Sequence, residues 1–210
     1  MGRTDPLTPP ERPQPPSGRK APVPKKKRPG PYRVPPRDQR HGLVILNIGE
    51  GKGKTTAALG VLLRATGRGM RVGMFQFVKS MSDNGEHRTA ARLGVEIIPL
   101  GDGCTLGKPD VTDATALAQA GWERCASALS IGEYDVLILD ELTLPLAWAW
   151  ISTTTVVDAI RNRSQGTHVI VTGRLAPPAL MEIADLITEM REIKHPFRAR
   201  GLTAQAGVDV

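Results

Sequence analysis

GEGKGKTT at residues 49–56 joins an apolar, β-branched run, residues 43–48, to a segment with helical spacing, residues 54–66. A glycine-rich turn between a strand and a helix lets successive backbone N–H groups point at phosphate oxygens, and the helix N-terminus adds a partial positive charge. An ordinary strand-to-helix turn is the alternative, but Gly-Lys-Thr at the helix start favours a phosphate-binding loop, or P-loop. The predicted nucleotide-binding residues of the loop are Gly49, Glu50, Gly51, Lys52, Gly53, Lys54, Thr55 and Thr56.

Two side chains of this loop have specific predicted roles. The Lys54 ammonium can bind the phosphates and act in catalysis, and the Thr55 hydroxyl is placed to bind Mg²⁺. One position departs from the general pattern, because a standard loop has glycine five residues before Gly53 and this chain has Ile48 there. The loop is therefore a variant, which narrows the choice of protein family.

A second motif, YDVLILDE at residues 134–141, is an apolar strand that ends in two carboxylates. Ligands of parallel sheets lie beyond the carboxyl ends of the strands, so Asp140 and Glu141 should lie near the P-loop. One can hold Mg²⁺ directly and the other through water, because Mg²⁺ usually keeps several waters. Such a pair alone is more often a surface strand end. Together with Lys54 it predicts a metal site at Thr55, Asp140 and Glu141, and Glu141 is also a candidate catalytic residue.

Strands and helices alternate along the chain from residue 42 onward. Expected strands cover residues 43–48, 71–77, 95–99, 134–139, 167–172 and 186–193, and expected helices cover residues 54–66, 86–93, 110–129 and 154–163, with one more that begins at Pro177. This alternation is typical of a parallel sheet with helices on both faces. We therefore expect residues 42–210 to form one three-layer α/β sandwich of the P-loop NTPase (RecA-like) class.

The N-terminal segment, residues 1–41, has a different composition. It holds twelve of the eighteen prolines, and its eleven Lys/Arg against three Asp/Glu give a net charge of +8. Much proline and charge with little to bury predicts a disordered, basic, proline-rich tail. Since the whole chain is +7, residues 42–210 come to −1. A nearly neutral body argues against nucleic acid as a partner, because a nucleic-acid-binding fold carries its positive charge on a folded face.

Cysteine content and hydropathy indicate the compartment. The only two cysteines, Cys104 and Cys125, are too few for a disulfide framework and have no metal-like spacing, which favours a reducing environment. The longest apolar run, residues 142–151, contains a proline and is too short to span a bilayer, so no membrane partner is expected. The N-terminus lacks the apolar segment of a secretory signal. The cytoplasm is the expected location.

The order and spacing of the motifs resemble the corrinoid adenosyltransferases of the cob(I)yrinic acid a,c-diamide type. The resemblance runs from about residue 42 to residue 210. It rests on seven collinear matches, at residues 49–58 (GEGKGKTTAA), 75–79 (FQFVK), 139–143 (LDELT), 172–174 (TGR), 184–189 (ADLITE), 194–197 (KHPF) and 207–209 (GVD).

The resemblance implies a reaction in which the 5′-deoxyadenosyl group of ATP moves to the cobalt of a reduced corrinoid and triphosphate is released. Cobalt(I) is itself the nucleophile and attacks C5′ of the ribose, so the protein need not supply a general base. Its tasks are to position both reactants and to stabilise the triphosphate leaving group. Lys54, the loop amides and Mg²⁺ on Thr55 and Glu141 suit the second task. The family also suggests a reductase that delivers reduced cobalt and a possible homodimer.

The corrinoid side of the site departs from the family. Members commonly carry Gly-Phe-Thr-Trp after the third strand, where this chain has GCTL at residues 103–106. Those aromatic rings press on the lower face of the corrinoid, whereas Cys104 and Leu106 keep apolar character without large rings. We expect Cys104 to be a small apolar substitute, with cobalt ligation as the alternative. The expected corrinoid-binding residues are Phe77, Lys79, Cys104 and Leu106.

Other residues keep two interpretations. Arg174 follows a strand and either contacts phosphate or is solvated. His195 is expected to make structural hydrogen bonds, with catalysis as the alternative. Trp148 and Trp150 are expected in a core or an interface, with a wall facing the corrinoid as the alternative.

Three other functions remain open from the residues alone. One is an ATPase that acts on nucleic acid, in which the basic tail would bind the polymer. Another is a non-catalytic chaperone that binds a nucleotide or a corrinoid, which the missing aromatic pair would permit. A small-molecule kinase is the third, although no acidic base motif separate from Asp140 and Glu141 stands out.

Overall fold

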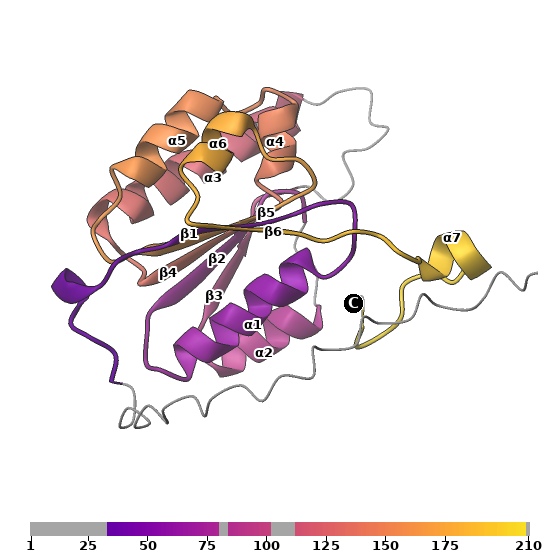
Figure 1. Cartoon of the computed structure of the whole chain (residues 1–210), viewed down its shortest axis with the longest axis horizontal. Helices are drawn as coiled ribbons and strands as arrows, with labels where there is room; N and C mark the ends of the chain where they lie inside the picture. The colour runs from indigo at the N-terminus through magenta and orange to yellow at the C-terminus, as the bar shows by residue number, and fades with distance from the viewer. Residues whose placement is uncertain (1–32, 80–83, 102–111, 209–210) are drawn as a thin grey trace, which may run out of the picture. The chain divides into compact units, whose positions relative to one another are not determined.

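A computed structural model describes residues 33–79, 84–101 and 112–208, with the compact unit beginning at Val34. Its centre is a six-stranded sheet in the order β3-β2-β4-β5-β1-β6, in which every neighbouring pair is parallel (Figure 1). The strands are β1 (Val44–Ile48), β2 (Val72–Gln76), β3 (Glu96–Pro99), β4 (Val136–Asp140), β5 (His168–Thr172) and β6 (Leu186–Glu189).

Helices cover both faces of this sheet (Figure 1). α1 (Lys54–Thr66) and α2 (Gly85–Arg92) lie on one face, and α3 (Thr112–Ile131), α4 (Thr143–Ala147), α5 (Thr153–Arg161) and α6 (Pro178–Glu182) lie on the other. The chain also forms η1 (Arg37–Gln39) before the sheet and α7 (Pro196–Arg200) after it. The predicted three-layer α/β sandwich with a P-loop is confirmed.

The protein has two hydrophobic clusters, one on each face of the sheet, because the central strands are buried on both faces. Alternate side chains of a strand point to opposite faces, so Phe75 and Leu137 pack with α3 and α5, while Met74 and Ile138 pack with α1 and α2. Strands buried on both faces read as continuous apolar runs, as they do here. All five residues of β4 are buried, and the strand carries its terminal carboxylate, Asp140, to the edge of the α1 face.

The largest differences between the structure and the sequence-based boundaries are three. β6 ends at Glu189 rather than at residue 193, because its partner β1 ends opposite it, at Ile48, where the P-loop begins. The apolar run at residues 142–151 contains α4, and the segment after β6 contains α7, each only five residues long. Elements this short carry too little periodicity to be recognised in a sequence.

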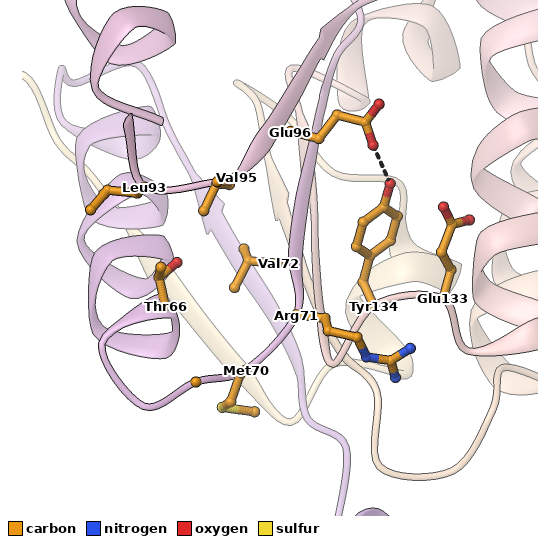
Figure 2. A pocket seen from close by; sticks show the side chains of 11 residues that line it. Thr66, Met70, Arg71, Val72, Leu93, Val95, Glu96, Glu133 and Tyr134 are labelled. Atoms are coloured by element: carbon orange, nitrogen blue, oxygen red, sulfur yellow. Dashed lines mark hydrogen bonds between the residues drawn. The ribbon is translucent and has the colours of Figure 1, made fainter. Parts of the chain in front are cut away.

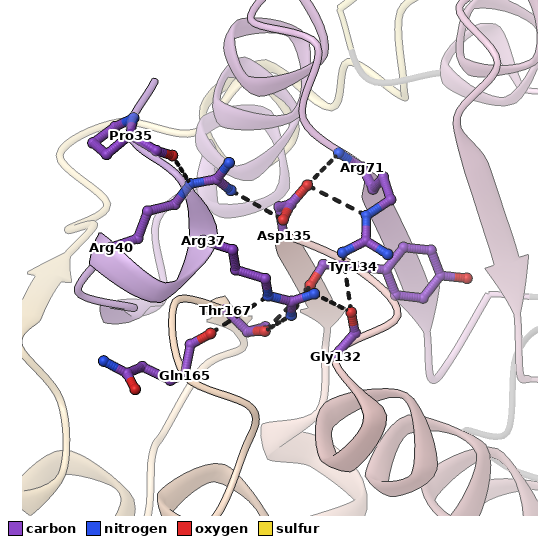
Figure 3. A network of polar contacts seen from close by, with 9 residues as sticks. All are labelled: Pro35, Arg37, Arg40, Arg71, Gly132, Tyr134, Asp135, Gln165 and Thr167. Atoms are coloured by element: carbon purple, nitrogen blue, oxygen red, sulfur yellow. Dashed lines mark hydrogen bonds and ion pairs between the residues drawn. The ribbon is translucent and has the colours of Figure 1, made fainter. Parts of the chain in front are cut away.

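The third difference lies at the start of the body, which begins at Val34 rather than at Gly42. Arg37 donates hydrogen bonds to the carbonyls of Gly132 and Tyr134 and to the Thr167 hydroxyl (Figure 3). Arg40 pairs with Asp135 at 3.0 Å. These two arginines bind the segment to the amino ends of β4 and β5. Residues 1–32 of the predicted tail lie outside the described residues.

Hydropathy along the helices bears on the membrane expectation. Within the described parts of the chain, no helix combines the length and the apolar character needed to cross a bilayer.

Candidate functional site

The P-loop runs from the end of β1 to the start of α1, and two of its glycines have a positive φ. Gly49 has φ +108° and Gly53 has φ +107°. A Cβ on Gly49 would also lie 2.4 Å from the Met190 carbonyl oxygen. Both conditions demand glycine at position 49. Ile48 stands where the general pattern has glycine because it is still a strand residue, paired with Glu189, so the curl of the chain starts one residue later.

Lys54 is the first residue of α1, and its side chain lies inside the curl of the loop. The Nζ atom donates to the Gly51 carbonyl at 2.9 Å, and the residue is only 9% exposed. The Gly51 amide donates to the carbonyl of Met190 at 2.7 Å, so the residue that follows β6 also fixes the loop from outside. The ammonium is thus held inside the curl of the loop.

Asp140 joins the P-loop to three strand ends. Its Oδ1 atom accepts from the Thr55 hydroxyl at 2.9 Å and from the Thr172 hydroxyl at 2.7 Å. Its Oδ2 atom accepts from Gln76 Nε2 at 3.2 Å. Asp140, Thr172 and Gln76 have no exposed surface. The carboxyl ends of β2, β4 and β5 therefore meet the start of α1 at one buried carboxylate.

Glu141 follows Asp140 in a left-handed conformation, with φ +57°. Its backbone amide donates to the Thr172 hydroxyl at 2.9 Å. This conformation is costly for a residue with a Cβ, and such strain clusters at functional sites. Burial, followed by the charge of Asp140, raises the pKa of the Glu141 carboxyl, although the cations Lys54, Arg174 and Lys79 act in the opposite direction.

The residues at this edge have the donor chemistry that Mg²⁺ requires. Hard cations take oxygen ligands, and the Thr55 hydroxyl and the Asp140 carboxylate are already in hydrogen-bond contact, with Glu141 next in the chain. Gln76 Oε1 adds a buried oxygen acceptor that lacks a partner among the residues the structure describes. The arrangement fits a Mg²⁺ that accompanies a nucleotide in the P-loop.

Arg174 lies at the rim of the loop. Its carbonyl accepts from the Gly49 amide at 2.8 Å, and its guanidinium pairs with Glu50 at 2.8 Å. Both side chains of the pair are more than half exposed, so the pair is open to exchange for another anion. The structure brings Arg174 to the predicted nucleotide site.

The expected corrinoid residues are distributed differently. Phe77 is 3% exposed and packs in the α3 and α5 core, so its ring offers no open face. Lys79 pairs with Glu86 of α2 at 3.1 Å. Cys104 and Leu106 lie outside the described residues. The structure therefore leaves Lys79 as the one described member of this set with an accessible polar head group.

Trp148, Trp150 and His195 make contacts that are typical of structural residues. Trp148 and Trp150 have ring centroids 4.6 Å apart, and Trp150 packs at the border of the larger core. His195 Nδ1 accepts from the Phe197 amide at 3.2 Å and so caps α7. These contacts agree with the core or interface expectation for the tryptophans and with the structural expectation for His195.

The sequence reasoning missed Gln76 and Thr172, which share Asp140 with Thr55. Gln76 is the last residue of β2 and Thr172 the last of β5, and in each strand apolar residues precede it. Each also lies inside one of the matched motifs, FQFVK and TGR. A polar residue that ends a buried strand at the carboxyl edge was the available signal.

A cavity of about 480 Å³ lies at the opposite, amino end of the sheet. Leu93, Val95 and Val72 form one wall, and the Tyr134 hydroxyl donates to Glu96 at 2.7 Å on the other (Figure 2). Glu133, also on that wall, is held by Arg124 through two hydrogen bonds of 2.6 Å. Because these polar groups already bind one another, the cavity offers little to a ligand.

Comparison with known proteins identifies the family of the chain. The chain matches the ATP:corrinoid adenosyltransferase BtuR/CobO/CobP family over residues 40–210. It is 37% identical over 177 residues to a corrinoid adenosyltransferase of Escherichia coli K12, covering 84% of this chain and 90% of the relative. It is 38% identical over 175 residues to one of Pseudomonas aeruginosa, covering 82% and 85%. The corrinoid adenosyltransferase CobA of Salmonella typhimurium is 36% identical over 177 residues, with 84% and 90% covered.

Among solved structures, the flagellar accessory protein FlaH of Methanocaldococcus jannaschii aligns with a TM-score of 0.47 at 13% identity over 71% of each chain. The match to the family begins at Arg40 and includes the P-loop, the acidic strand end and α7. The chain is a member of the ATP:corrinoid adenosyltransferase family.

Proposed function

We propose that the cluster of Lys54, Thr55, Asp140 and Glu141 is the ATP site of this transferase. As a member of its family, the chain transfers the adenosyl group of ATP to a corrinoid in cobalamin synthesis. The observation that supports the proposed site is the convergence of the P-loop and the acidic strand end on Asp140, 2.9 Å from Thr55. The group moved is the 5′-deoxyadenosyl group, and the second product is triphosphate.

The roles of the residues follow from the charge that develops in the reaction. As the bond between C5′ and its oxygen breaks, negative charge grows on the triphosphate, and fixed positive groups stabilise it. Lys54 already lies inside the loop, and Arg174 can exchange Glu50 for a phosphate oxygen. The backbone amides of residues 49–56 complete the binding of the phosphate chain. No side chain is required as a nucleophile, because cobalt(I) is the attacking group.

Mg²⁺ would be held by Thr55 and by Asp140 or Glu141, with water between the metal and the other carboxylate. When bound, the ion supplies positive charge that neutralises the phosphates. The raised pKa of Glu141 is consistent with this role, because burial and the adjacent charge of Asp140 disfavour the charged form of the Glu141 carboxyl.

The corrinoid would approach the carboxyl edge from the side of Lys79, with Cys104 and Leu106 near its lower face. Phe77 would act from the core, as support for Lys79, rather than through its ring. Cob(I)alamin and cob(I)yrinic acid a,c-diamide are the candidate substrates, and a reductase would supply cobalt(I). We also propose a cytoplasmic location and a homodimer.

One incubation tests the proposal and separates it from the nucleic-acid ATPase. The full chain is mixed with Mg-ATP and chemically reduced cobalamin, the corrinoid spectrum is followed, and released phosphates are identified. We expect adenosylated corrinoid and inorganic triphosphate in equal amounts, with negligible ATP hydrolysis when corrinoid is left out. Release of ADP without corrinoid, and its stimulation by DNA or RNA, would instead support the ATPase.

A further inference from the structure

Gln76 is a buried amide in an otherwise apolar strand. It is the last residue of β2 and has no exposed surface. In the pairing of β2 with β4 it stands directly opposite Asp140, and the next backbone amide, of Phe77, donates to the Asp140 carbonyl at 3.0 Å. Register alone therefore keeps the two side chains next to each other. An apolar residue would fill this position at lower desolvation cost, so the presence of an amide here needs a separate explanation.

The hydrogen bonds of Asp140 supply that reason. Its Oδ1 atom has two hydroxyl donors, Thr55 and Thr172, whereas its Oδ2 atom has the Gln76 amide, at 3.2 Å. Donors on both oxygens fix the plane of a carboxylate. Without Gln76 the carboxylate could rotate about its Cβ–Cγ bond and carry Oδ1 away from Thr55. The amide thus holds the geometry in which Asp140 and Thr55 act together.

The oxygen of the same side-chain amide, Oε1, is in a different situation from the nitrogen. Because Nε2 must face the carboxylate, Oε1 points away from it, and within the described parts of the chain this buried oxygen has no hydrogen-bond partner. A buried acceptor without a donor is costly and rare in folded proteins. The cost is removed when a water or another donor enters the site together with a ligand and donates to Oε1.

We propose that Gln76 is a positioning residue that sets the affinity of the site for the divalent cation of the nucleotide by orienting Asp140 toward Thr55. The inference rests on the proposed ATP site. Partners that orient a metal-binding carboxylate typically change metal affinity by about 10- to 100-fold when they are removed. In this assignment Gln76 contacts neither the nucleotide nor the corrinoid. Its removal should therefore lower the affinity for the metal more than the affinity for either substrate.

The test compares Gln76→Met, which keeps the length of the side chain and removes the donor, with Met74→Leu as a matched control. Met74 lies on the same strand and the same face, is equally buried, and stands opposite Ile138 rather than Asp140. Mn²⁺ binding to each full-length protein is measured by electron paramagnetic resonance at saturating ATP. ATP binding in excess EDTA is measured separately by equilibrium dialysis.

We expect Gln76→Met to bind Mn²⁺ about tenfold more weakly, while its metal-free ATP affinity stays within about twofold. Met74→Leu should change neither value. Equal Mn²⁺ affinity in Gln76→Met and the unaltered chain would overturn the inference, as would an equal loss in Met74→Leu. If the unaltered chain itself binds no ATP, the proposed ATP site fails, and this result is distinct from the first.

Two further measurements cover the case in which Gln76→Met does not fold. Gln76→Asn keeps an amide that is too short to reach Asp140, and we expect the same loss of Mn²⁺ affinity. In the unaltered chain, the side-chain amide of Gln76 should be the slowest of the described glutamines to exchange, since the other four are exposed. Its resonance should shift when Mg²⁺ is added to the ATP complex, and a resonance that does not respond would overturn the inference.

Discussion

Charged side chains at the two ends of the sheet differ in how they are paired. At the amino end, Arg40 and Arg71 both pair with Asp135, and the guanidinium of Arg37 is surrounded by carbonyl and hydroxyl oxygens (Figure 3). At the carboxyl end, Lys54 donates to a loop carbonyl, and Glu141 lies partly buried beside a second carboxylate. The fully paired charges at the amino end hold the fold together. The incompletely paired charges at the carboxyl end can bind a substrate.

The pKa directions show the same contrast. Burial would raise the pKa of Asp135, but hydrogen bonds from the backbone and side chain of Arg71, with the charges of Arg71 and Arg40, hold it below its usual value. Burial and Asp140 instead leave the pKa of Glu141 above its usual value. The first carboxylate is stabilised in its charged form, and the second is prepared for a cation.

The largest expected effect is at Lys54, in the carboxyl-end group. Lys54→Ala removes the cation that would stabilise the leaving triphosphate, which is typically worth about 3 kcal/mol or more in a water-poor site. We expect kcat to fall by about 100-fold or more while the thermal unfolding temperature stays unchanged. The control is Arg64→Ala, which removes an exposed cation from the same helix. Near-normal turnover of Lys54→Ala at saturating ATP would contradict the P-loop assignment.

The next effect is on stability and lies at the amino end. Asp135→Asn keeps the shape of the side chain but removes the charge that holds Arg40 and Arg71, and we expect a loss of about 2 kcal/mol in the free energy of unfolding. Urea unfolding gives this value, and the affinity for ATP should stay within about twofold. An Asp135→Asn protein that is fully stable but binds ATP poorly would reverse the comparison between the two ends.

Truncation locates the boundary of the anchored segment. Deleting residues 1–33 should leave the free energy of unfolding unchanged, because the compact unit begins at Val34. Extending the deletion to residue 40 also removes Arg37 and Arg40, and we expect a loss of about 1–2 kcal/mol. ATP affinity should stay within tenfold, or about 1.4 kcal/mol, in both proteins. A larger loss in the shorter deletion would place the tail in the ATP site.

The sequence predicted the local parts of this molecule well. α1 begins at Lys54 and ends at Thr66 as expected, since Gly53 and Gly67 bound a clear helical pattern. The pairing of the P-loop with Asp140 followed from a general rule about parallel sheets. The contacts of Gln76 and Arg37 could not be predicted, because both depend on which strand lies beside which. Partners of Arg37 lie more than ninety residues away in the chain.

The smallest expected effect is a pH dependence at His168, the first residue of β5. Its Nδ1 atom accepts from the Leu43 amide at 3.1 Å, which requires the neutral ring. Burial, followed by the charges of Arg40 and Arg163, lowers the pKa of His168 from 6.5. The unfolded chain therefore takes up this proton at a higher pH than the folded chain, so the stabilisation is complete above pH 6.5 and is lost as pH falls toward the folded pKa. Stability should accordingly decrease between pH 7.5 and about pH 5.5.

His168→Asn separates this residue from the other three histidines. The Asn carbonyl oxygen can accept from Leu43 at any pH, so part of the pH dependence of unfolding should disappear while stability at pH 7.5 changes little. Urea unfolding of both proteins at several pH values measures the difference in slope. Identical slopes would show that His168 keeps an ordinary pKa in the folded chain.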